Sequence, residues 1–77
     1  MKQYTLAPLN ADAWRVLAPD GAHVGNLKRV GAVWKFKAIG YEANGQLVPG
    51  GGPLTGQHNA MLPHPDALAL NAVLHEP

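Results

Sequence analysis

The side chains best able to act on another molecule are basic, and they are concentrated in the middle of the chain. Residues 14–40 hold five Lys or Arg residues against one acid, a balance of +4, whereas the rest of the chain has one Lys against four acids. The basic residues of this stretch are Arg15, Lys28, Arg29, Lys35 and Lys37. Such a group of cations can neutralise phosphates, and arginine and asparagine can reach the edges of bases.

The composition offers little for catalysis. The chain has no serine and no cysteine, so the commonest nucleophiles are absent, and the two threonines, Thr5 and Thr55, are not N-terminal. The five carboxylates are dispersed, with no pair at a spacing suited to acid–base work. We therefore expect a protein that is not an enzyme.

Two further patterns invite a ligand, and neither matches a known motif. His58, His64 and His75, with Asp66, do not have the spacing of a metal-binding motif. The run 50–52 is Gly-Gly-Gly, but it lacks the following Gly-Lys-Ser/Thr of a phosphate loop and is flanked by prolines. We expect no metal and no cofactor, and a structural turn at the glycine run.

Turn signals divide the central stretch into three strands, which must position the cations. Pro19-Asp20-Gly21 is a strong turn signal and Val30-Gly31 a weaker one, so the strands are expected at 13–18, 22–29 and 32–40. If each hairpin has a two-residue loop, the apolar face has three cross-strand rows. These rows are Trp14, Leu27 and Trp34; then Val16, Gly25 and Phe36; then Ala18, His23 and Ala38.

The same register predicts a basic, solvated face on the other side of the sheet. Its rows are Arg15, Asn26 and Lys35, then Leu17, Val24 and Lys37, with Lys28 opposite Val33. Lys28 and Arg29 add charge next to the second turn.

The rest of the chain supplies cover for the apolar face. Residues 2–6 alternate as a short strand that Pro8 is expected to end, and Asn44-Gly45 predicts a hairpin with a short fourth strand at 46–48. Residues 49–65 form a Gly/Pro-rich connection. Residues 66–75 form a helix that begins near Asp66.

The chain of 77 residues is long enough for a single small domain, covering 1–77. We expect an α+β fold: a three-stranded antiparallel β-meander over 13–40, extended by that short fourth strand, with the C-terminal helix packed on the face that bears Trp14, Trp34 and Phe36. No apolar run is long enough to span a bilayer, and the N-terminus lacks the apolar block of a secretion signal. The expected location is the cytoplasm.

This arrangement resembles a known type of DNA-binding domain. An antiparallel three-stranded sheet with a C-terminal helix across one face and a basic opposite face is similar to the arm-binding domain of tyrosine-type phage integrases, and to the GCC-box-binding and methyl-CpG-binding domains. The segment WRVLAPDGAHVGNLKRVGAVWKFKA carries the likeness. The resemblance implies that the exposed face contacts DNA in the major groove, with Arg15, Asn26, Lys35 and Lys37 at the matching positions.

We therefore expect a small, non-enzymatic binding module whose leading ligand is nucleic acid. The candidate nucleic-acid-binding residues are Arg15, Asn26, Lys28, Arg29, Lys35 and Lys37. The alternative is a protein-interaction or structural domain that uses an open sheet edge or self-association. No membrane and no small-molecule cofactor is expected as a partner.

Overall fold

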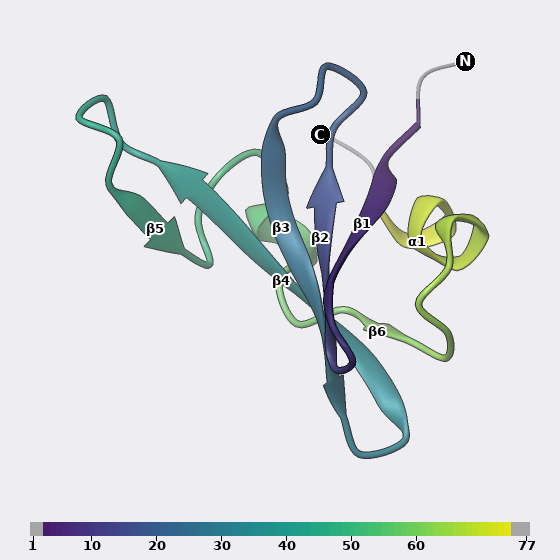
Figure 1. Ribbon diagram of the computed structural model, residues 1–77. Helices are drawn as coiled ribbons and strands as arrows, with labels where there is room; N and C mark the ends of the chain where they lie inside the picture. The colour runs from purple at the N-terminus through teal and green to yellow at the C-terminus, as the bar shows by residue number, and fades with distance from the viewer. Residues whose placement is uncertain (1–2, 75–77) are drawn as a thin grey trace.

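The computed structural model describes residues 3–74 and shows an antiparallel sheet with one short helix at its side (Figure 1). The elements are β1 (Thr5–Asn10), β2 (Ala13–Leu17), β3 (His23–Val30), β4 (Val33–Tyr41), β5 (Leu47–Pro49), the 3-10 turn η1 (Thr55–Gln57), β6 (Met61–Leu62) and α1 (Ala67–Val73). The strand order is β1-β2-β3-β4-β5, and β6 also pairs with β4. The predicted α+β class is confirmed.

The predicted number of strands was too small. β1 extends the sheet beyond β2, while β5 and β6 both pair with β4. Pro8 was expected to end the first strand, yet it lies inside β1. An edge strand tolerates proline where the position that lacks an N–H points away from the neighbouring strand. Residues 49–65 were expected to be a simple connection, and they contain η1 and β6.

The first hairpin has the predicted register near its open end, but its loop is different. Trp14 pairs with Leu27 and Val16 with Gly25, as expected. The loop has three residues rather than two, because Ala18 N–H donates to Ala22 O at 2.8 Å, and Gly21 adopts φ 90°. An odd loop length requires a one-residue bulge to restore the pairing, and the register shifts between Val16 and Leu17.

That bulge overturns the prediction for His23 and Val24. We expected His23 on the apolar face and Val24 on the basic face. Val24 is instead buried in the core. His23 Nε2 lies 2.8 Å from Oδ1 of Asn26, on the basic face. The extra residue of the bulge reverses the alternation at this end of β3.

The second hairpin is shifted by two residues from the prediction. Its loop is Gly31-Ala32, with Gly31 at φ 64°, and Val30 pairs with Val33. Phe36 therefore lies opposite Leu27 rather than Gly25. A glycine at the first loop position accommodates the positive φ, which a β-branched valine resists. Because the shift is two residues, every side chain of β4 keeps its predicted face.

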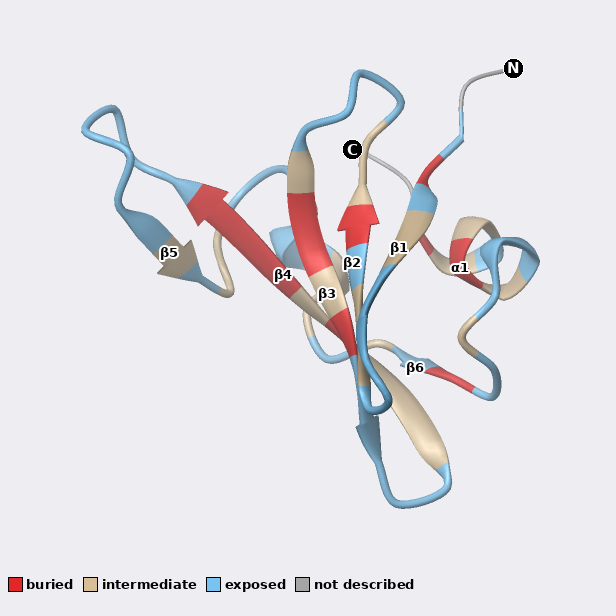
Figure 2. Ribbon diagram, viewed as in Figure 1, coloured by how far each residue is buried: buried red, intermediate tan, exposed pale blue. Residues whose placement is uncertain are grey.

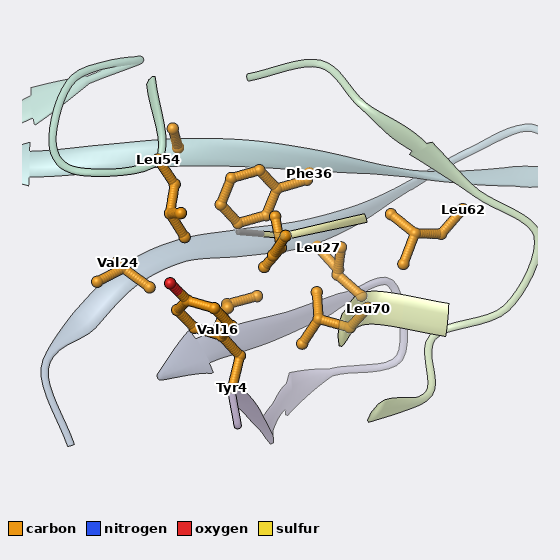
Figure 3. Close-up of a cluster of buried hydrophobic side chains, with 10 residues drawn as sticks. Tyr4, Val16, Val24, Leu27, Phe36, Leu54, Leu62 and Leu70 are labelled. Carbon is orange, nitrogen blue, oxygen red and sulfur yellow. The ribbon is translucent and has the colours of Figure 1, made fainter. Parts of the chain in front are cut away.

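The core lies on the Phe36 side of the sheet and is closed by three later segments (Figures 2 and 3). Phe36 is fully buried, and its ring lies over Gly25, where a Cβ atom would be 2.4 Å from it. The buried cluster consists of Tyr4, Val16, Val24, Leu27, Phe36, Ala38, Leu54, Leu62, Leu70 and Leu74. Trp14 and Trp34 are only partly buried at its margin. The helix, Leu54 and Leu62 together cover this core.

Helix α1 is shorter than predicted, and its Asn71 is hydrogen-bonded to Tyr4 near the start of the chain. Asp66 is its N-cap and accepts a hydrogen bond from Ala69 N–H at 2.7 Å. The helix ends at Val73, with Leu74 as C-cap, and residue 75 of the predicted span lies outside the described residues. The Asn71 side chain accepts from Tyr4 N–H and donates to Tyr4 O, both at 2.9 Å. An amide side chain thus takes the place of a strand beside Tyr4.

Candidate functional site

Five of the six predicted binding residues lie on one face of the sheet, opposite Phe36. Two cross-strand rows contain them: Ala7, Arg15, Asn26 and Lys37 form one, and Ala13, Lys28, Lys35 and Met61 form the other. We call Arg15, Asn26, Lys28, Lys35 and Lys37 the basic face. The shift in the second hairpin places Lys37, rather than Lys35, beside Asn26.

The basic face has no acidic neighbour to neutralise it within residues 3–74. None of the strands β1 to β4 contains Asp or Glu. The ion pair formed within this part of the chain joins Arg29 and Asp12, neither of which is on the basic face. Lys28 and Lys35 are directly opposite each other, an arrangement that destabilises a sheet by repulsion. The four cations therefore have no carboxylate partner in residues 3–74, and Lys37 Nζ donates a hydrogen bond to the neutral Oδ1 of Asn59.

Arg29 lies apart from the other predicted residues. It pairs across the strands with Trp34, which places it on the core side of the sheet near the second turn. Its guanidinium forms a salt bridge with Asp12, with Nε 2.8 Å from Oδ1. Its backbone N–H also donates to Asp12 O at 2.9 Å. These contacts hold the β1–β2 turn against β3, and strand alternation alone could have separated Arg29 from Lys28.

Two residues that were not among the predicted binding residues, His23 and Tyr41, lie at the end of the basic face. Tyr41 Oη is 3.4 Å from His23 Nδ1, and His23 Nε2 is 2.8 Å from Asn26 Oδ1. Because a carbonyl oxygen only accepts, Nε2 carries the proton and Nδ1 accepts from the phenol. The side-chain amide nitrogen of Asn26 can then donate a hydrogen bond to a ligand. The bulge that brings His23 here has no clear sequence signal.

The outer side of β4 is completed by residues 50–60. Gly50 N–H donates to Ala38 O at 2.7 Å, and Phe36 exchanges hydrogen bonds with Ala60 O at 2.8 Å and Asn59 N–H at 2.7 Å. His58 provides the acceptor for a further backbone group of β4, because its Nδ1 accepts a hydrogen bond from Ala38 N–H at 3.0 Å. His58 therefore has a structural partner. In the described part of the chain no three His, Cys, Asp or Glu residues are grouped to hold a metal, and His75 lies outside it.

Replacing His58 with alanine should lower the free energy of unfolding by about 1–3 kcal/mol. The substitution leaves the N–H of Ala38, a residue only 1% exposed, without its acceptor. Urea denaturation followed by circular dichroism measures the loss. His64→Ala is the matched control: His64 is exposed, so its removal should change stability by no more than about 0.5 kcal/mol. Equal midpoints for the two variants would show that the imidazole does not support β4.

Residues 3–74 enclose no pocket, and their one helix is too short to cross a membrane. A ligand of the basic face must therefore bind on an open surface rather than in a pocket. The lysines and the arginine can provide charge and hydrogen-bond donors there, and Asn26 provides a neutral donor between them. Such a surface suits an acceptor-rich, extended anion.

Comparison with protein-family models, with curated proteins and with solved structures finds no match to this chain.

Proposed function

We propose that this protein binds nucleic acid through the basic face, chiefly by contacts with the phosphate backbone. The observation that carries the proposal is the alignment of Arg15, Lys28, Lys35 and Lys37 on one face of the sheet, with no carboxylate partner in residues 3–74. Neighbouring strands are about 4.8 Å apart, and residues two positions apart along a strand are separated by about 6.7 Å. The four charges therefore spread over an area that an extended polyanion can follow.

The repulsion between Lys28 and Lys35 supports the proposal further. Two like charges directly opposite each other cost a sheet roughly 0.2–1 kcal/mol. A phosphate bound between the two lysines removes their repulsion. The free energy recovered in this way adds to the affinity for the ligand.

The alternative is a protein-interaction domain that uses a sheet edge. In its favour, β1 pairs only with β2 among the described strands. Against it, Pro8 lies within β1 and removes a donor from that strand, which makes it a poor template for another chain. At the opposite edge, β4 is paired with β5, β6 and residues 50–60, and β5 and β6 are only three and two residues long, too short to template another strand well. The edges therefore offer less to a partner than the basic face does.

Fluorescence anisotropy with labelled DNA at several salt concentrations tests the proposal. If all four cations contact phosphates, the plot of log affinity against log salt should have a slope of roughly −3. Lys28→Gln should weaken binding to every sequence alike and make the slope shallower by about 1. The cause is the loss of one phosphate contact.

Arg29→Gln is the matched control for this experiment. It removes the same charge from the adjacent residue, but on the opposite face, where Arg29 is engaged by Asp12. The slope should stay as in the wild type. An equal change in the two variants would mean that net charge, and not the basic face, governs binding. An affinity that does not depend on salt would remove the proposal itself.

A further inference from the structure

The chain has five aromatic residues, all within the described part, and four of them pack in the hydrophobic core or at its edge. Tyr4 and Phe36 are buried, and Trp14 and Trp34 are partly buried at the edge of the core. Tyr41 is different. It is 54% exposed, and it ends β4 before the hairpin that projects from the sheet (Figures 1 and 2).

Tyr41 lies on the same side of β4 as the lysines of the basic face. Strand β4 has no bulge in its pairing with β3 or β5, so alternation gives Lys35, Lys37 and Tyr41 the same side of the strand. Ile39, which lies between Lys37 and Tyr41, shares this side and is buried. The six-residue step from Lys35 to Tyr41 spans about 20 Å. Two lysines and an exposed ring thus share one side of the strand, with one buried apolar residue between them.

The phenol is also held in place. Its hydroxyl is 3.4 Å from His23 Nδ1, and His23 is in turn bound to Asn26, between Arg15 and Lys37 in the cross-strand row. Leu47 lies directly opposite it on β5. A ring restrained by a long hydrogen bond at its hydroxyl and by a cross-strand neighbour loses less conformational freedom than a free side chain when a flat group stacks on it.

We propose that Tyr41 is a stacking platform for an unpaired base, so that the preferred ligand of the basic face is single-stranded nucleic acid. The inference rests on the proposed function, since the four cations hold the phosphates while Tyr41 holds a base. Proteins that bind single strands combine a positively charged path with aromatic rings on which bases stack. In a duplex each base is already stacked between its neighbours, so the ring has no free partner.

The experiment uses three labelled DNA probes of equal length, about ten nucleotides: a single strand, an abasic single strand and a duplex. The abasic strand keeps every phosphate but offers no base. The wild-type protein should bind the normal single strand about tenfold more tightly than the abasic strand, which corresponds to one stacked base. It should also bind the single strand more tightly than the duplex.

Tyr41→Leu isolates the role of the ring. Leucine keeps an apolar neighbour for Leu47, so the hairpin is retained, but it cannot stack. The tenfold preference for the normal strand over the abasic one should disappear, with the affinity for the abasic strand unchanged. Tyr41→Phe, which keeps the ring, should retain most of the preference. Thermal unfolding of both variants confirms that they are folded.

Two results would overturn the inference while leaving phosphate binding intact. One is wild-type protein that binds abasic and normal strands equally, and the other is a Tyr41→Leu variant that keeps the preference; in both cases the salt dependence persists. Absence of salt-dependent binding to all three probes would overturn both this inference and the proposed function.

Discussion

Gly52→Ala is expected to cost this protein its folded state. A Cβ atom at Gly52 would lie 2.1 Å from the carbonyl oxygen of Ile39 and 2.8 Å from its carbon. Both are backbone atoms of β4, the strand that pairs with β3, β5 and β6, so they cannot move without displacing the centre of the sheet. Gly40 has the matching constraint, since its own Cβ would meet Gly52 N at 2.5 Å. The glycine run is thus a close crossing of two backbones.

The expected loss of stability is comparable to the whole free energy of unfolding of a small domain. A chain of this length has a free energy of unfolding of roughly 4–12 kcal/mol. Forcing the loop away from β4 also breaks the hydrogen bond from Gly50 N–H to Ala38 O. We expect Gly52→Ala to show little cooperative unfolding by circular dichroism at 25 °C, or a free energy of unfolding lowered by about 4 kcal/mol or more.

Gly45→Ala provides a control for the backbone term. Gly45 has φ 88° and Gly52 has φ 85°, so alanine is equally disfavoured at both by its local conformation. No atom lies within 4 Å of a Cβ at Gly45. Its replacement should therefore cost only about 1–2 kcal/mol. Similar losses in the two variants would mean that the crossing at Gly40 and Gly52 is looser than its geometry indicates.

The double variant Arg15→Glu/Lys28→Glu should lose nucleic-acid binding while remaining folded. The two reversals bring the charge of the basic face from +4 to zero, because two glutamates then balance the two remaining lysines, Lys35 and Lys37. Removing two phosphate contacts and adding two repulsions should lower the affinity at least about 100-fold at low salt. Anisotropy with labelled single-stranded DNA measures the loss.

This variant separates binding from stability better than a substitution in the core would. Arg15 and Lys28 are both exposed, and the Lys28→Glu change replaces a repulsive cross-strand pair with an attractive one opposite Lys35. The free energy of unfolding should stay equal or rise by up to about 1 kcal/mol. A folded double variant that binds DNA like the wild type would exclude the basic face as the binding surface.

Several local features of the fold could be predicted because they depend on neighbouring residues only. Alternation along the strands placed Arg15, Asn26, Lys35 and Lys37 on one side and Phe36 on the other, and the structure agrees. This held even where the register was wrong, since a shift of two residues preserves the face. The turns at Gly21, Gly31 and Gly45 have the positive φ that glycine allows.

The remaining features depend on contacts between distant residues. The odd loop at 19–21 moved His23 to the basic face and Val24 into the core, which a two-residue loop would not have done. Arg29 forms its ion pair with Asp12, 17 residues away in the sequence, because β1 joins the sheet and brings the β1–β2 turn next to β3. His58 completes β4 from 20 residues away, and its partner is a backbone N–H that no side-chain pattern reveals.

Outside the bulge at His23 and Val24, the sequence alone thus determined which face of the sheet each strand residue takes, since a period of two is a property of each strand by itself. Tertiary structure decided which residues become neighbours across those strands, because loop lengths and the closing of residues 50–62 over β4 set the register and the edges. The association of Tyr41, His23 and Asn26 at the end of the basic face belongs to this second kind.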